Sequence, residues 1–269
     1  MSDSTRSSLP TLPPRPDLRR RVLAGEPTVG AWVNLGSLAS TELLARSGFD
    51  WLVLDLEHGM GGEAEIHAQL LAVQGTATCA LVRPASAERL RIGRALDLGA
   101  DGLVVPRLET LAEVAETLRW MRYPPAGIRG VALTTRGGGY FEVGHEELAA
   151  SVNDRVLGVF QVESPEAVAA ADQIAAIDGV DVLFVGPADL SHAMGIAGRF
   201  AEPAFTNALD AVVAACRSHG KAAGILLGDA SFVPEYLSRG FTFLGIGSDG
   251  GWVASGAKAQ LSSARAALG

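Results

Sequence analysis

The 269-residue sequence has only two cysteines, Cys79 and Cys216, which form neither a CxxC pair nor a disulfide framework. This usage predicts a reducing, cytoplasmic setting. Long apolar runs are also missing, because none reaches the roughly 18 residues that a membrane helix needs. We therefore expect neither a membrane protein nor a disulfide-rich secreted domain.

Positive charge is scarce, with 22 basic against 30 acidic residues and a formal net charge of −8. Nucleic acids and acidic membranes favour a basic face, so neither is an expected partner. Small anionic substrates need only a few local cations, so the net charge does not exclude them. The only lysines, Lys221 and Lys258, do not follow predicted strands, which argues against catalysis through a lysine Schiff base.

The beginning of the chain differs in composition from the rest. Residues 1–16 are polar and then proline-rich, without the apolar region of a signal peptide. We expect them to form a disordered tail. No linker divides residues 17–269, so we expect one domain there.

Short apolar runs alternate with helical stretches along this domain. The runs predict eight buried strands, at residues 29–33, 51–54, 79–82, 103–105, 156–161, 182–185, 222–226 and 243–246. Helical spacing covers residues 17–23, 63–73, 87–98, 111–121, 166–177, 205–219 and 232–238. This alternation indicates an α/β fold, a single (β/α)8 TIM barrel. A doubly wound open sheet is disfavoured because no glycine fingerprint follows the first strand.

Two stretches interrupt the alternation, at residues 123–144 and 191–203. Long loops in compact domains are usually functional or mobile, and a plain solvated loop is an equal alternative for either stretch.

Two carboxylates stand where buried strands end, Glu163 and Asp189. In a barrel the C-terminal ends of strands carry the catalytic side chains, so both are expected at one rim. Two oxygen ligands with room for water and substrate suit a divalent cation such as Mg²⁺ or Mn²⁺. For either residue alone, a helix N-cap is the competing interpretation.

The same rule selects His58 and Arg83 after the second and third strands. A neutral imidazole at His58 could remove a proton beside the metal, although a lone histidine is more often structural. Arg83 would place a fixed cation in the barrel mouth, where an enolate or carboxylate could use it. Its alternative is a structural ion pair with Asp55 or Glu57. Asp97 could raise the basicity of His58 if the two residues meet.

The last predicted strand runs into a glycine-rich turn, residues 245–251. Many barrels bind phosphate at this place, but nothing basic accompanies the turn, so it is a weak phosphate site.

Taken together, several motifs make the sequence resemble the HpcH/HpaI family of class II pyruvate aldolases. They are Asp-x-Glu-His-Gly within residues 51–59, Val-Arg-Pro at 82–84, the Arg-Tyr-Pro-Pro motif at 122–130, Gln-Val-Glu at 161–163, and Gly-Pro-Ala-Asp-Leu-Ser at 186–191. The resemblance runs from about residue 30 to the end. It implies a metal-dependent cleavage of 4-hydroxy-2-oxo acids into pyruvate and an aldehyde, with Mg²⁺, Mn²⁺ or Co²⁺.

The resemblance also implies roles for particular residues. Glu163 and Asp189 would bind the metal, while Gln161, Asp189 and the backbone of Ala188 would hold the keto acid. The implied catalytic residues are His58 as general base, Arg83 as stabiliser of the transition state, and Asp97 as the acid that raises the basicity of His58.

Relatives of this kind assemble as hexamers, trimers of dimers, with an exchanged last helix (here near residues 252–267) and active sites close to subunit boundaries. The triple glycine at residues 137–139 departs from the family pattern, so the acceptor aldehyde does not carry over. Two alternatives remain. A citramalyl- or malyl-CoA lyase would want a basic surface, and the second alternative is a non-catalytic barrel that binds a keto acid.

Overall fold

The computed structural model describes residues 17–107, 110–142 and 144–268. The tail expected at residues 1–16 lies outside the described residues. Eight parallel strands close a barrel in chain order: β1 Thr28–Val33, β2 Trp51–Asp55, β3 Cys79–Arg83, β4 Gly102–Val105, β5 Leu157–Val162, β6 Val182–Val185, β7 Ala222–Leu227 and β8 Phe241–Ser248. All eight predicted strands are confirmed, with ends that differ by at most two residues. The fold is a (β/α)8 barrel.

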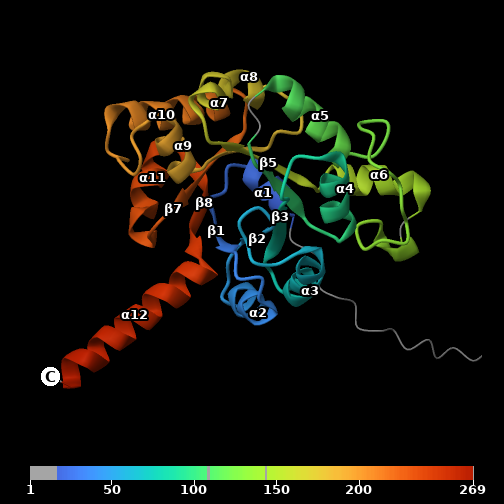
Figure 1. Cartoon of the computed structure of the whole chain (residues 1–269). Helices are drawn as coiled ribbons and strands as arrows, with labels where there is room; N and C mark the ends of the chain where they lie inside the picture. The colour runs from blue at the N-terminus through green and yellow to red at the C-terminus, as the bar shows by residue number, and fades with distance from the viewer. Residues whose placement is uncertain (1–16, 108–109, 143, 269) are drawn as a thin grey trace, which may run out of the picture.

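Helices surround the strands on the outside (Figure 1). Those predicted from the sequence are α1 Leu18–Leu23, α3 Glu63–Val73, α4 Arg89–Asp97, α5 Leu111–Met121, α10 Pro203–Ser218 and α11 Val233–Arg239. The helix predicted at residues 166–177 is two short helices, α7 Pro165–Ala169 and α8 Ala171–Ala175. None of the helices in the described part of the chain is long and apolar enough to cross a membrane.

Three further helices lie where the sequence suggested none: α2 Leu38–Arg46, α6 His145–Asn153 and α9 Pro187–Ala193. The second long loop is therefore shorter than expected, because α9 continues through its first residues. Helix α9 begins with Pro187, whose fixed φ suits the first helical position. The first long loop is confirmed, with only the short 3₁₀ turn η1 Gly139–Phe141 in its described part.

The barrel interior is filled by aromatic side chains. Trp51 stacks on Phe243 with 4.1 Å between the ring centroids, and both are fully buried. Gly30 makes room for this stack, because a Cβ there would lie 2.0 Å from the Trp51 ring. Leu18 and Val22 of α1 join the same cluster and close the N-terminal end of the barrel. The opposite end is left open for a site.

The last helix, α12 Asp249–Leu268, leaves the barrel and projects away from it (Figure 1). Every described residue of α12 except Asp249 and Gly250 is exposed, including Trp252, Val253 and Leu261.

Candidate active site

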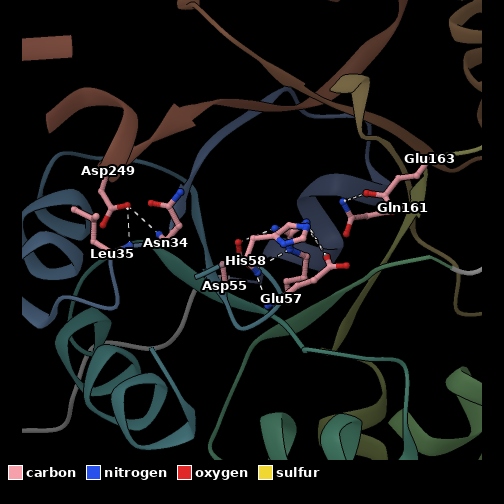
Figure 2. Close-up of polar contacts among 9 residues, drawn as sticks. Asn34, Leu35, Asp55, Glu57, His58, Gln161, Glu163 and Asp249 are labelled. Carbon is pink, nitrogen blue, oxygen red and sulfur yellow. Dashed lines mark hydrogen bonds and ion pairs between the residues drawn. The ribbon is translucent and has the colours of Figure 1, made fainter. Parts of the chain in front are cut away.

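One cavity of about 550 Å³ opens at the C-terminal ends of the strands. Six site residues expected from the sequence line it: His58, Arg83, Gln161, Glu163, Ala188 and Asp189. Asp55 and several apolar side chains line it as well, whereas the expected Asp97 does not. Figure 2 shows His58 beside Asp55 and Glu57, and Gln161 and Glu163 to the right of these three residues. Strand ends far apart in the sequence thus meet around one space, as the barrel rule predicts.

The two rim carboxylates do not cap helices. Ser164 is the N-cap of α7, where its side chain accepts a hydrogen bond from the Ala167 N–H. Gly186 holds the cap position of α9, which leaves Asp189 in the first helical turn. The capping interpretation is therefore wrong for both residues. Both carboxylates instead line the cavity.

Glu163 lies near two other carboxylates, and Arg83 does not fully balance their negative charge. Burial and the neighbouring carboxylates of Asp189 and Glu57 raise its pKa to about 7, against the opposing effect of Arg83. Gln161 donates from Nε2 to Glu163 Oε1 over 2.9 Å, and its own Oε1 is buried without a hydrogen-bond partner. A cation beside Glu163 would satisfy both groups.

These residues fit a divalent metal ion. Among the described residues no three His, Cys, Asp or Glu side chains form a metal cluster, so the protein offers two carboxylates, Glu163 and Asp189. Hard cations such as Mg²⁺ are commonly held by one or two carboxylates with water and substrate in the other positions. The Oε1 atom of Gln161 has no hydrogen-bond partner and would add an uncharged oxygen near the ion.

Arg83 is buried between two acidic residues. Its Nε donates to Asp55 Oδ1 over 2.9 Å and its Nη2 to Asp55 Oδ2 over 2.6 Å. Its Nη1 lies 3.0 Å from Glu57 Oε2. The structural ion pair considered from the sequence is thus present, and Arg83 also lines the cavity. The pairing fixes the guanidinium in place, which is what a preorganised stabiliser of negative charge requires.

His58 lies at the mouth of the cavity. Its side chain is 68% exposed, and the nearest carboxylate oxygen, Glu57 Oε2, is 4.0 Å from Nε2. Its backbone N–H donates to Asp55 Oδ1 over 3.3 Å.

Asp97 does not reach His58 within this chain. It is the last residue of α4, which runs antiparallel to the strands, so it lies at their N-terminal ends. A five-residue strand puts the two ends roughly 15 Å apart. The Asp97 carboxylate instead accepts a hydrogen bond from Arg129 Nη2 over 2.8 Å.

Arg107 is a residue of the site that the sequence reasoning missed. Its backbone N–H donates to Glu163, and it lines a second cavity of about 400 Å³ that shares Gln161, Glu163 and Asp189 with the first. Its φ of 53° is in the left-handed region, which is uncommon for a residue other than glycine. Its position just after β4 is a signal that the strand-end rule could have used.

Comparison with known proteins identifies the family of this chain. Residues 28–256 match the sequence profile of the HpcH/HpaI aldolase/citrate lyase family. The chain belongs to this family. Among relatives in the HpcH/HpaI family, a 5-keto-4-deoxy-D-glucarate aldolase of Klebsiella pneumoniae is 38% identical over 82% of this chain and 86% of its own length.

A 4-hydroxy-2-oxo-heptane-1,7-dioate aldolase of Escherichia coli is 37% identical over 88% of this chain and 90% of its own. A crystal structure of an HpcH/HpaI aldolase/citrate lyase family protein from Burkholderia cenocepacia superposes with a TM-score of 0.87 at 34% identity, over 92% of this chain and 98% of that one.

Proposed function

We propose that this protein is a divalent-metal-dependent lyase that cleaves 4-hydroxy-2-oxo acids into pyruvate and an aldehyde, and catalyses the reverse condensation. The observation that carries the proposal is the convergence of Glu163, Asp189, Arg83 and His58 on one cavity. The aldolase names of the family relatives support the same reaction class. The metal is Mg²⁺, Mn²⁺ or Co²⁺, held by Glu163 and Asp189, and it polarises the keto group as a Lewis acid when bound.

The residues around the metal ligands bind and orient the keto acid. Ala188 and Asp189 lie in the first turn of α9, where backbone N–H groups have no acceptor within the helix and can bind a carboxylate. Asp189 therefore contributes to both the metal and the substrate. Gln161 supplies the amide that completes this side of the cavity.

His58 and Arg83 then perform the proton transfer and stabilise the charge. His58 takes the proton of the 4-hydroxyl, directly or through a water, while the C4–O bond becomes the aldehyde carbonyl. The C3–C4 bond breaks and its electron pair forms the pyruvate enolate. Arg83 stabilises the negative charge on the enolate oxygen. The protonated His58 returns this proton to C3, directly or through a water, which completes pyruvate and restores the base.

The same proposal includes a homo-oligomer, a trimer of dimers in which α12 is exchanged between subunits. The exposed apolar residues of α12, among them Trp252 and Leu261, support docking of this helix on another subunit. Asp97 can act on His58 only from a second subunit, because the two lie at opposite ends of one barrel. The cysteines, Cys79 and Cys216, are both buried and not disulfide-bonded, which agrees with a cytoplasmic location.

A CoA-ester substrate is less well supported. CoA carries phosphates that require cations near the cavity. Of the described residues that line the main cavity, Arg83 is the only lysine or arginine, and it is already paired with Asp55 and Glu57.

The decisive experiment measures pyruvate release from 4-hydroxy-2-oxo-heptane-1,7-dioate in an assay coupled to lactate dehydrogenase. Activity should fall to background after treatment with EDTA and return when Mg²⁺ or Mn²⁺ is added. Full activity in metal-free protein would rule out the proposed metal dependence.

Replacing His58 by alanine should lower kcat by about 10²–10⁴-fold, because a positioned general base contributes about that much. The limb of the pH profile that reports deprotonation of the base should disappear with it. The matched control is His67→Ala, on the exposed side of α3, which should keep the wild-type profile. An unchanged pH profile in the His58 variant would assign the base to another group.

A further inference from the structure

The sequence predicts a glycine-rich turn at residues 245–251, but β8 continues to Ser248 and α12 begins directly at Asp249. Asp249 is a buried carboxylate that the proposed chemistry does not use. Asp249 is 3% exposed, and no lysine or arginine of the described chain pairs with it. Its Oδ1 accepts hydrogen bonds from the N–H groups of Asn34 at 2.9 Å, Leu35 at 3.4 Å and Gly250 at 2.8 Å. Its Oδ2 accepts from Ser40 Oγ at 2.7 Å. A carboxylate at this place disfavours phosphate binding to residues 245–251.

These hydrogen bonds fix the loop that follows β1. The loop after β1 in turn contacts the loop after β2, which carries His58. The carbonyl oxygen of Asn34 accepts a hydrogen bond from the Met60 N–H over 2.8 Å. The two loops also touch through their backbones, because a Cβ at Gly36 would lie 2.8 Å from the nitrogen of Gly61. Figure 2 shows the Asp249 carboxylate directed at Asn34 and Leu35.

The position of His58 depends on these backbone contacts, because its side chain is largely exposed and packing cannot hold it. Besides the ion pair of Arg83 with Glu57, three hydrogen-bond anchors hold its loop. The Asp55 carboxylate binds the N–H of His58, and the carbonyl of Arg83 accepts from the start of the loop. The third anchor is the Asn34 carbonyl, which binds the far end. The first two belong to the strands of the site, whereas the third depends on Asp249.

We propose that Asp249 is a positioning residue for the reaction: through Asn34 it holds the loop of His58 so that the imidazole stays at the mouth of the cavity. The kinetic part of this inference rests on the proposed function of His58 as base. Because Asp249 is also the first residue of α12, the direction of that helix and the placement of His58 share one carboxylate.

The test uses the full-length, Mg²⁺-loaded enzyme and three variants. Asp249→Ala removes every acceptor, whereas Asp249→Asn keeps an oxygen for the three backbone donors. Ser40→Ala removes one donor and is the milder variant if Asp249→Ala does not fold. The matched control is Asp181→Ala, since Asp181 is 1% exposed and accepts from the Gly158 N–H at the opposite end of the barrel.

Hydrogen exchange of the amides of residues 56–62 should speed up by about tenfold or more in Asp249→Ala, by a smaller factor in Ser40→Ala, and remain near wild type in Asp249→Asn. Cleavage of the dioate substrate should follow the same order, with kcat lowered about 10–100-fold in Asp249→Ala and KM changed by less than about threefold. Asp181→Ala should leave both readouts for this loop unchanged.

Unchanged exchange at residues 56–62 in both Asp249→Ala and Ser40→Ala would overturn the inference. Equal acceleration in Asp181→Ala would overturn it too, because the effect would then reflect general destabilisation. The exchange measurement is independent of catalysis. A wild-type enzyme that releases no pyruvate would therefore refute the proposed function while the loop coupling is still tested.

Discussion

Replacing Arg83 by alanine should lower kcat by about 10²–10³-fold, the effect of removing one preorganised group that stabilises an oxyanion. It should also destabilise the fold, because Asp55 and Glu57 would be left as buried carboxylates without a counter-charge. Breaking a buried ion pair by removing one partner costs about 3–5 kcal/mol. We therefore expect the variant to be both less active and less stable than wild type.

A second substitution separates the two effects. Adding Asp55→Asn to Arg83→Ala removes one uncompensated charge, and the asparagine oxygen can still accept from the N–H groups of Glu57 and His58. Urea unfolding should show that stability recovers in part, while pyruvate release stays at the level of the single variant. If turnover recovered together with stability, the role of Arg83 would be structural only.

Arg83→Lys should also be poorly active, because an ammonium group cannot bind both oxygens of Asp55 side by side.

Replacing Glu163 by glutamine should abolish metal-dependent turnover and at the same time stabilise the metal-free protein above pH 7. An unfolded glutamate ionises above a pKa of about 4.5, whereas burial and the neighbouring carboxylates raise the folded pKa to about 7. The folded state therefore holds the extra proton in this window, so the wild-type protein loses stability as the pH rises through it. The glutamine variant avoids this loss, on the order of 3 kcal/mol.

Urea unfolding in EDTA at pH 5 and at pH 8 measures this difference, and Glu166→Gln, an exposed neighbour on α7, is the matched control. The glutamine variant at position 163 should gain stability over wild type at pH 8 and little at pH 5. Calorimetry should show that wild-type protein releases a proton as it binds Mn²⁺ near pH 7, and that the glutamine variant does not. Metal-dependent turnover retained in this variant would remove Glu163 from the metal site.

The two predictions are opposite in their effect on stability for a common reason. Arg83 supplies positive charge to a site crowded with carboxylates, and Glu163 adds negative charge to it. Removing the arginine worsens the imbalance, whereas neutralising Glu163 relieves it. A site that binds a cation tightly is expected to be strained in this way without its cation, which is a common trade of stability for function.

Much of the fold follows from local patterns in the sequence. Buried strands such as β2 and β6 are short apolar runs bounded by turns, so neighbouring residues are enough to predict them. The barrel rule then places Glu163, Asp189 and Arg83 at one rim, since parallel strands end on the same side. Helix α9 was missed because a helix that begins with Gly186-Pro187 looks like a turn.

Contacts between distant segments were decided only by the tertiary structure. Helix α4 returns the chain to the N-terminal end of the barrel, so Asp97 lies away from His58. The role that the family resemblance implies for Asp97 therefore cannot be performed within one chain. Closure of the barrel pairs β1 with β8 and brings Asp249 to the N–H of Asn34, 215 residues earlier. No local pattern encodes such a contact, because it arises only when the first and last strands meet.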